Sequence, residues 1–317
     1  MAKNRDIVQE IADIRQRRQY GDAMSELPMR LLSLRAAFEK HDPLQEELSR
    51  YFPVALIACI EGYVRLAVKD LIDSGEPYFG NAEKLAPAKL DFATLRAIHG
   101  KAITVGELIA HSISVSRLEH IDGVFSSLLG RSFLQGLRTV SDRWAHEVRG
   151  ESLTPILADP EWVFGKVERA FELRHIICHE IASAHEWYWE EIRDCFAACV
   201  AFLRAADELV SETLYPGSPL TQTEMNIAAG EELIAKRTEL TEVFASVKQQ
   251  FPESFHDLYD EAQEKWQEYA TAWGMCVAGK REDGGTIWPI VYAGAEKDAI
   301  DRRIEQLREF RPVWGKV

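Results

Sequence analysis

A short stretch of the chain gathers an arginine and two histidines among apolar residues. Residues 172–180 read ELRHIICHE and contain Arg174, His175 and His179. Arginine is permanently charged and its planar guanidinium suits phosphate or carboxylate oxygens, whereas an imidazole takes up or releases a proton near neutral pH. These residue types together favour chemistry on an anionic ligand, with the arginine binding the anion and a histidine moving a proton.

The helix that carries these residues is predicted to span 161–184, and its apolar residues share one face. At about 100° per residue, five side chains form a core stripe. They are Leu173, Ile176, Ile177, Ile181 and Ala184. The side chains of Arg174, His175 and His179 lie on the opposite side, with Arg174 and His179 at its two margins roughly 140° apart. The polar residues are therefore predicted to form a second face of the helix.

Two other interpretations of this polar face stay open. One is an ordinary solvated surface, or a pair of histidines hydrogen-bonded at the edge of the core. The other is a metal site, because His175 and His179 are four residues apart on a helix and can share one ion. The sequence lacks an HExxH motif, and the remaining ligands would have to come from Cys178, Glu180 or His185.

The rest of the chain predicts an all-α protein in which this helix is packed. Hydrophobic residues make up 46% and charged residues 28%, which is typical of a globular protein. Helical periodicity dominates, and alternation typical of strands is nearly absent. The helices are expected at 4–20, 26–40, from about 43, 52–75, 91–99, 104–113, 116–130, 132–144, 161–184, 185–213, 221–249, 253–279 and 295–310. The segments 76–90, 147–160 and 280–294 are expected to be irregular.

The segment LYPGSPLTQTEMN, residues 214–226, is the best candidate for a domain boundary. It places two prolines and a glycine within four residues, which breaks helices. We therefore predict a helical domain at 1–215 and a second, smaller helical domain at 216–317.

Charge and cysteine content limit the class of function and the compartment. The net charge of −14 divides into −8 before residue 218 and −6 after it, so neither part has the broad basic surface of a protein that binds long nucleic acids. No signal peptide is evident, and no run approaches the roughly 18 to 20 apolar residues of a membrane span. The five cysteines include no CxxC pair. Free thiols in the cytoplasm, with no membrane partner, are the expectation, and Cys195 and Cys199 are expected to be buried and inert.

The segment RHIICH, residues 174–179, resembles the signature of the HEPN superfamily. That signature has an arginine, a polar residue directly after it, apolar residues and a histidine, all in a late helix of an all-α bundle. The context is similar too, because the motif precedes one last long helix and follows an apolar helix that carries Glu61. The resemblance covers roughly residues 25–213.

The HEPN resemblance implies a metal-independent endoribonuclease without a cofactor, usually a homodimer whose Arg and His faces meet. It implies that Arg174 stabilises the phosphate, that His179 is the general acid or base and that His175 orients or assists. Glu61 would hold Arg174 in place, although a helix pair from Glu61 to Arg65 explains that glutamate equally well. Some HEPN toxins carry a tyrosine two positions after the histidine, where a partner nucleotidyltransferase silences them. Here that position is Ile181, which argues against this route of silencing.

Residues 221–310 resemble a different family, the lysozyme inhibitors of the LprI type. The matching segments are TQTEMN at 221–226, AQEKWQEYATAWGMC at 262–276, GGTIWPIVYAG at 284–294 and RRIEQLREF at 302–310. Members of that family are typically exported and have disulfides, but Ala228 and Ala295 stand where two of the cysteines are usual and Cys276 is the one that is kept. We interpret the domain as a cytoplasmic accessory module that packs or recognises a partner and do not expect it to inhibit lysozyme; binding of a ligand or a cell-wall-derived target is the alternative. We expect Trp266 and Trp273 to lie in its core.

Two functions follow from these resemblances. The first is an RNA-cleaving toxin or phage-defence effector, with RNA as substrate and an antitoxin as a possible partner. The second is a non-catalytic dimeric scaffold that binds RNA or other molecules, in which the C-terminal domain binds a protein partner. The acidic net charge mildly favours the second.

Overall fold

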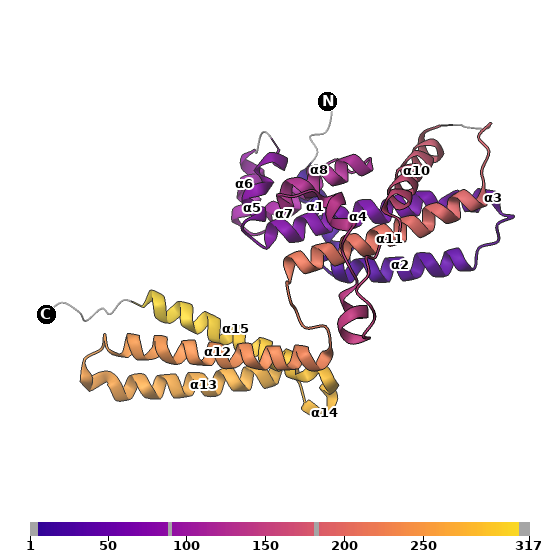
Figure 1. The fold of residues 1–317 in the computed structure, drawn as a ribbon. Coiled ribbons are helices and arrows are strands. Elements are labelled where there is room, and N and C mark those ends of the chain that lie inside the picture. Colours follow the sequence, from indigo (N-terminus) through magenta and orange to yellow (C-terminus); the bar gives the residue numbers. More distant parts are fainter. Residues whose placement is uncertain (1–5, 88–90, 181–183, 311–317) are drawn as a thin grey trace. The chain divides into compact units, whose positions relative to one another are not determined.

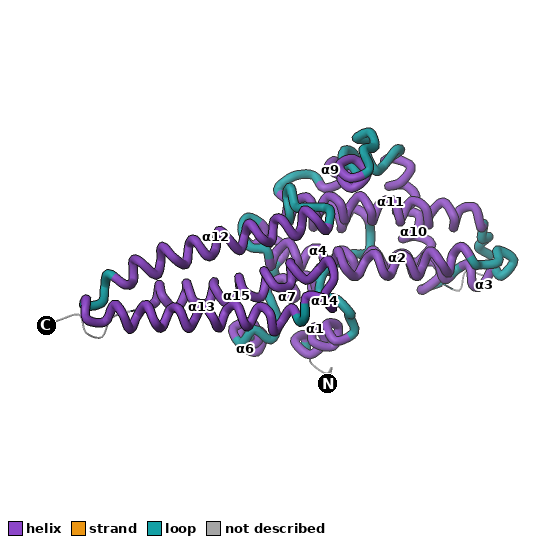
Figure 2. The backbone as a smooth tube through the Cα atoms, turned by 90° about the horizontal axis from the view of Figure 1, so that it is seen from below, coloured by secondary structure: helices purple, strands orange, loops and turns teal. Residues whose placement is uncertain are grey.

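The computed structural model describes residues 6–87, 91–180 and 184–310. These residues form helices and contain no strand, as Figure 2 shows, so the predicted all-α class is confirmed. The chain divides into two compact units, Met1–Gly217 and Ser218–Val317. This division falls inside the predicted boundary segment, two residues after the predicted boundary.

Unit 1 contains eleven described α-helices and two short helical turns, which can be followed by label in Figure 1. The α-helices are α1 (Ile7–Gln16), α2 (Ala23–Glu39), α3 (Glu46–Ser49), α4 (Tyr51–Asp73), α5 (Tyr78–Asn81), α6 (Phe92–His99), α7 (Val105–Ser112), α8 (Leu118–Leu129), α9 (Phe133–Leu137), α10 (Pro160–His179) and α11 (Trp189–Leu214). The turns are η1 (Ala82–Leu85) and the π-helical turn η2 (Trp144–Val148).

Helix α4 is the centre of unit 1. Its sequence is apolar on nearly all sides, and Leu56, Ile57 and Ile60 are fully buried. Helices α2, α7, α10 and α11 pack around it. Because each fully buried aliphatic side chain contributes roughly 1.5–3 kcal/mol, α4 supplies much of the stability of this unit. Glu61, on a partly exposed side of α4, is the residue of this helix that lies beside Arg174.

One stretch within the described residues, Glu46–Asp73, is long and apolar enough to cross a membrane by length and composition. The expectation that no segment approaches this length was therefore wrong. In the structure 67% of its most apolar window is buried inside unit 1. The stretch includes α4, so its apolar character is explained by packing from several sides.

Helix α10 is shorter than predicted. It begins at Pro160, where the carboxylate of Asp159 accepts a hydrogen bond from the backbone N–H of Trp162 at 3.0 Å. It ends at His179, because Glu180 has an extended backbone with φ −119° and ψ 143°. The prediction that it continues to 184 was wrong, and α11 begins at Trp189 instead of 185.

The predicted core stripe of α10 is correct only in its first part. Leu173 is buried and Ile177 packs against the core, whereas Ile176 is half-buried. Ala184 is exposed because the helix has already ended. Ile181 was predicted to be part of the stripe, and it occupies the position where some HEPN toxins have the tyrosine. It lies outside the described residues.

Three other segments differ from the prediction. The expected irregular segment 76–90 contains α5 and η1. The expected helix 132–144 contracts to α9, followed by the turn η2. The expected irregular segment 280–294 contains two short turns and the beginning of the last helix, which starts at Trp288. Pro289 lies in the first turn of that helix, where a proline costs no hydrogen bond.

Unit 2 is built from three long helices. They are α12 (Gln222–Lys248), α13 (His256–Ala278) and α15 (Trp288–Glu309), with the turns η3 (Glu253–Phe255), α14 (Arg281–Gly284) and η4 (Gly285–Ile287) between them. Helix α15 packs against both α12 and α13. The core residues where α12 meets α15 repeat every seven positions along each helix, as in a coiled coil. They are Leu233, Leu240 and Val247 on α12, and Ala293, Ile300 and Leu307 on α15.

Helix α13 packs against α15, beside the seam of core residues between α12 and α15, through small side chains. Ala270 and Gly274 are its buried residues. A Cβ atom at Gly274 would lie 3.0 Å from Cε2 of Tyr292, so the glycine permits a close approach of α13 to α15. Most of the large side chains of α13 therefore remain outside the core.

Candidate functional site

The last two turns of α10 display the predicted catalytic residues on the surface of unit 1. The side chain of Arg174 is 33% exposed, and that of His175 is 65% exposed. His179 is the last residue of the helix and is also exposed. The face is thus accessible to a ligand, the two histidines are not at the edge of the core, and the exposure also fits the alternative of an ordinary solvated surface.

Glu61 lies beside Arg174, as the sequence analysis expected. One of its carboxylate oxygens is 3.8 Å from Nη2 of Arg174, and the other is 3.9 Å from Nη1 of Arg65. Both interpretations of Glu61 therefore occur in one structure, because the carboxylate lies between two guanidinium groups. The ion pairs are long and partly exposed, so they orient Arg174 and contribute little free energy.

The two histidine rings of the site lie next to each other. Their centroids are 5.2 Å apart and their planes are inclined by 47°. Nε2 of His175 is 3.8 Å from a carboxylate oxygen of Glu180, the first residue after the helix. The structure thus brings two imidazole rings together at the end of α10, with a carboxylate beside His175.

A groove of about 630 Å³ runs beside this face. Its walls come from α10 and from the start of α8. The lining residues are Ser116, Arg117, Leu118, Glu119, Glu168, Arg169, Phe171, Glu172, Arg174, His175 and Ile176. Arg174 and His175 reach this groove, whereas His179 and Glu61 are not part of its wall.

The sequence analysis missed two arginines of the groove. Arg117 precedes α8 and has no ion pair among the described residues. Arg169 is held by Glu191 at 2.8 Å and by Glu172 at 2.9 Å, and these hydrogen bonds raise the pKa of its guanidinium above the ordinary value. Only the packing of α8 against α10 brings Arg117 to Arg174 and His175, so no local sequence signal could have identified it.

The structure also bears on two other candidate features of unit 1, a metal site and reactive cysteines. Within the described ranges, no three His, Cys, Asp or Glu side chains come together in a way that could hold a metal ion. Cys195 and Cys199 are fully buried, as predicted. Burial raises the pKa of the Cys195 thiol to about 11 and that of Cys199 well above its ordinary value, so neither is a ready nucleophile.

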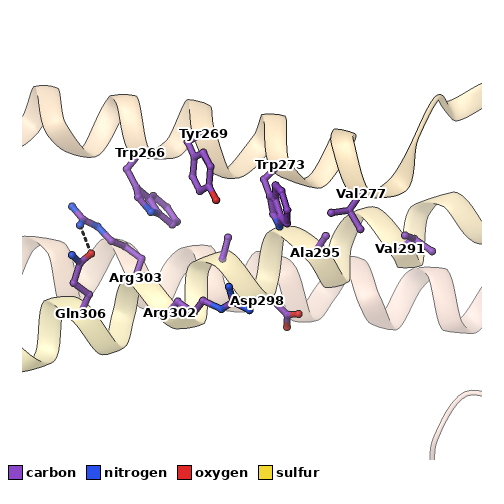
Figure 3. A pocket seen from close by; sticks show the side chains of 11 residues that line it. Trp266, Tyr269, Trp273, Val277, Val291, Ala295, Asp298, Arg302, Arg303 and Gln306 are labelled. Atoms are coloured by element: carbon purple, nitrogen blue, oxygen red, sulfur yellow. Dashed lines mark hydrogen bonds between the residues drawn. The ribbon is translucent and has the colours of Figure 1, made fainter. Parts of the chain in front are cut away.

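A second groove, of about 560 Å³, lies between α13 and α15 in unit 2. Figure 3 shows Trp266, Tyr269 and Trp273 projecting from α13 toward α15. Trp266 packs partly against the core of the unit, but Trp273 is 43% exposed and Tyr269 is 56% exposed. The expectation that both tryptophans belong to the core was therefore wrong for Trp273, because α13 covers the seam with only a narrow strip of its surface.

One end of this second groove is positively charged. Arg303 lies over the ring of Trp266, with its guanidinium carbon 5.8 Å from the ring centroid. Its Nε donates to Gln263 at 3.2 Å and its Nη1 donates to Gln306 at 2.6 Å. Arg302 lines the same end and is exposed.

Comparison with known proteins finds a family similarity for unit 2. Residues 217–307 match the family model described as Lysozyme inhibitor LprI, so the resemblance predicted for residues 221–310 is confirmed. No curated protein and no solved structure matches the chain. The HEPN resemblance of unit 1 has no match of this kind and stays a prediction. The fold and the match together describe an all-α chain of two units, the second of which is similar to the LprI family.

Proposed function

We propose that unit 1 is a metal-independent endoribonuclease of the HEPN type that acts as a dimer, in the role of a toxin or phage-defence effector. The observation that carries this proposal is the accessible cluster of Arg174, His175 and His179 beside a groove that holds two further arginines. A groove of this size accommodates one or two nucleotides, and its arginines suit their phosphates.

The proposed reaction uses the 2′-hydroxyl of the RNA as the nucleophile. A histidine takes the proton of this hydroxyl while its oxygen forms a bond to the adjacent phosphorus. The bond from phosphorus to the 5′ oxygen breaks, and a protonated histidine gives that oxygen its proton. The products are a 2′,3′-cyclic phosphate and a 5′-hydroxyl, so no water, metal ion or redox partner enters the step.

Each residue of the cluster has a role in this proposal. Arg174 binds the non-bridging oxygens and stabilises the charge that builds on them, with Glu61 holding the guanidinium in position. His179 transfers the proton, and His175, whose ring lies 5.2 Å away, orients or assists it. Arg117 extends the phosphate-binding wall of the groove. Three glutamates, Glu119, Glu168 and Glu172, also line the groove, and Arg169 is paired with Glu172 and Glu191, so Arg117 and Arg174 are the arginines proposed to bind phosphate.

A cleavage assay tests the proposal. Full-length protein is incubated with total RNA in the presence of EDTA, beside the variants Arg174→Ala and His179→Ala. Arg35→Ala is the matched control, because Arg35 is an exposed arginine of unit 1 on α2. We expect cleavage by the wild type and the control and loss of cleavage in both site variants. Equal cleavage by all four proteins, or none by the wild type, would refute the assignment.

The dimer is part of the same proposal. One α10 helix supplies one arginine and one pair of histidines, and a second chain would bring another set to the same site. Cys178 provides a probe, since it is exposed and directly precedes His179. If two α10 faces meet, mild oxidation is expected to cross-link two chains through Cys178. Cys178→Ser should abolish the cross-linked dimer, and Cys276→Ser, which removes the exposed thiol of unit 2, should keep it. A monomer mass in sedimentation, with no cross-link, contradicts the dimer.

The second candidate is partner recognition by unit 2, as part of a non-catalytic scaffold. It is favoured by the exposed aromatic side chains of α13 and by the match to LprI, a family described as lysozyme inhibitors. Under this alternative a protein partner, including an antitoxin, binds unit 2 and the cluster on α10 binds RNA without cleaving it. If the protein binds RNA, if Arg174→Ala weakens that binding, and if no cleavage occurs in EDTA, the scaffold is the correct function.

A cytoplasmic location is also part of the proposal. The described cysteines are all free, and three of them are buried thiols. Free thiols persist in a reducing compartment. Fractionation of expressing cells should find the full chain in the cytoplasmic fraction, and recovery from the cell exterior would contradict this.

A further inference from the structure

The groove between α13 and α15 has two long walls that run in opposite directions. On α13 the wall contains Trp266, Tyr269, Trp273 and Val277, spaced by three or four residues so that they share one face. On α15 it contains Val291, Ala295, Asp298, Ala299, Arg302, Arg303 and Gln306. In Figure 3 Trp266 lies at the same end as Arg303 and Gln306, and Val277 lies at the same end as Val291.

The groove has the length of a short helix. The stripe on α13 covers eleven residue steps from Trp266 to Val277, which corresponds to about 17 Å at 1.5 Å per residue. Ala295 and Ala299 form part of the opposite wall, and their small side chains leave room for another backbone to approach. Exposed Tyr269 and Trp273 are the residue types that most often carry the binding free energy of protein interfaces.

The charged and apolar side chains along the groove indicate which class of molecule it can bind. The end near Val277 and Val291 offers no polar side chain, so the hydroxyl groups of a sugar would lose their hydrogen bonds there. Unit 2 has a net charge of −6, which disfavours a polyanion such as RNA. An amphipathic helix avoids both problems, because its backbone polar groups are satisfied internally and one face is apolar.

The end near Arg302 and Arg303 sets the direction of that helix. Arg303 is already held by Gln263 and Gln306 and is half-buried, and this burial lowers the pKa of its guanidinium. Arg302 is exposed beside it. The C-terminal end of a helix carries a partial negative charge, and acidic side chains in its last turn add to this. Such an end complements the two arginines.

We propose that the groove between α13 and α15 binds an amphipathic α-helix of a partner protein, with the acidic C-terminal end of that helix over Arg302 and Arg303. The apolar face of the partner helix contacts Trp266, Tyr269, Trp273 and Val277. This inference deepens the partner-binding candidate for unit 2 and does not depend on RNA cleavage.

A peptide selection tests the proposal with the full chain as bait. The probe is a displayed library of 14-residue peptides with Leu, Ile, Phe or Trp at helical spacing of three and four. The other positions vary among Ala, Gln, Glu and Lys. We expect the enriched peptides to concentrate glutamate in the last turn. Failure to enrich any sequence over a bait-free control overturns the proposal.

The best enriched peptide is then labelled, and its Kd is measured by fluorescence anisotropy. Trp273→Ala and Tyr269→Ala should each weaken binding by about tenfold or more, as residues at the centre of an interface do. Arg302→Glu should weaken it similarly, and more at low salt. The matched controls are Leu258→Ala, an exposed apolar residue of α13 outside the groove, and Lys265→Glu, a charge reversal on the same helix. Both controls should keep the wild-type Kd, and circular dichroism should show all five variants folded.

Three results would overturn the inference. One is peptide binding that is equal in wild type and Trp273→Ala. Another is Trp273-dependent binding of a chitin oligosaccharide or an oligouridylate, which would assign the groove to a sugar or to RNA. The third is Trp273-dependent self-association in sedimentation, which would assign it to a second copy of the chain. None of these measurements includes RNA cleavage, so the inference and the endoribonuclease can fail separately.

Discussion

The two units differ in the side chains that line their grooves. In unit 1 the groove beside α10 is lined by charged side chains that include Arg174, and the two histidines lie next to each other at the end of that helix. In unit 2 aromatic residues such as Trp273 are exposed, whereas the carboxylate of Glu296 is buried at 1% exposure against Arg237. The groove of unit 1 is thus lined mainly by charged side chains, and that of unit 2 mainly by aromatic and aliphatic ones.

The largest expected effect separates the two histidines of unit 1. Because general acid–base catalysis contributes roughly 10²- to 10⁴-fold, His179→Ala should slow RNA cleavage by about that factor. His175→Ala should slow it less, since His175 only orients or assists. Single-turnover rates on one defined RNA measure both. A greater loss at His175, which lines the groove, would transfer the proton-transfer role to that residue.

The next effect concerns one aromatic residue in each unit. Phe133 is fully buried in unit 1, so Phe133→Ala should lower the free energy of unfolding by about 3–5 kcal/mol. Trp273→Ala should lower that of unit 2 by less than about 1 kcal/mol, because the side chain is partly in solvent already. Urea unfolding, with hydrogen exchange to assign each transition to a unit, gives both values. A loss of more than about 3 kcal/mol at Trp273 would mean that it belongs to the core.

A smaller effect compares the buried carboxylates of the two units. Glu296 is paired with Arg237, whereas Asp207 has no cation partner among the described residues, and burial raises its pKa to about 6 with Tyr63 opposing the shift. Because the folded state binds this proton more tightly than the unfolded state, stability due to Asp207 is lost as the pH rises from about 4 to 6. Asp207→Asn should therefore raise the free energy of unfolding by about 1–2 kcal/mol at pH 7.5.

The measurement for Asp207 is urea unfolding of both proteins at pH 4 and pH 7.5. The gain should be present at pH 7.5 and nearly absent at pH 4, where the wild-type carboxyl is protonated. Destabilisation by Asp207→Asn at both values of pH would show that the charged form is needed for the fold.

The smallest effect compares the two capping boxes. Thr221 caps α12 and Thr104 caps α7, each together with a glutamate three residues later. Thr221→Ala should cost about 1 kcal/mol. Thr104→Ala should cost more, because the Thr104 hydroxyl also donates to Asp73 at 2.8 Å. Calorimetry of both variants checks the order, and equal losses would mean that the hydrogen bond to Asp73 adds nothing.

The sequence predicted the parts of the molecule that depend on local pattern. Helical periodicity identified the all-α class, α4 as the apolar helix, and the surface face with Arg174, His175 and His179. The proximity of Glu61 to Arg174 was also expected, although it joins residues far apart in the chain. That expectation came from the family resemblance, because the spacing of Glu61 and Arg65 within α4 explained the glutamate equally well.

The parts that were missed depend on packing between distant elements. Arg117 reaches the groove only because the start of α8 lies beside α10. Trp273 has the heptad spacing of a core residue, but α13 contacts the seam through Ala270 and Gly274 and leaves the tryptophan outside. The end of α10 at His179 was missed because the apolar pattern continues through Ile181, beyond the last residue that is helical.

The central claim is that the cluster on α10 cleaves RNA by activating its 2′-hydroxyl. The most direct test gives the full-length protein in EDTA two oligonucleotides of one sequence, one of RNA and one with 2′-O-methyl groups throughout. We predict cleavage of the RNA alone, with 2′,3′-cyclic phosphate ends, and its loss in Arg174→Ala. Cleavage of both oligonucleotides, or cleavage that requires a divalent metal ion, would contradict the account.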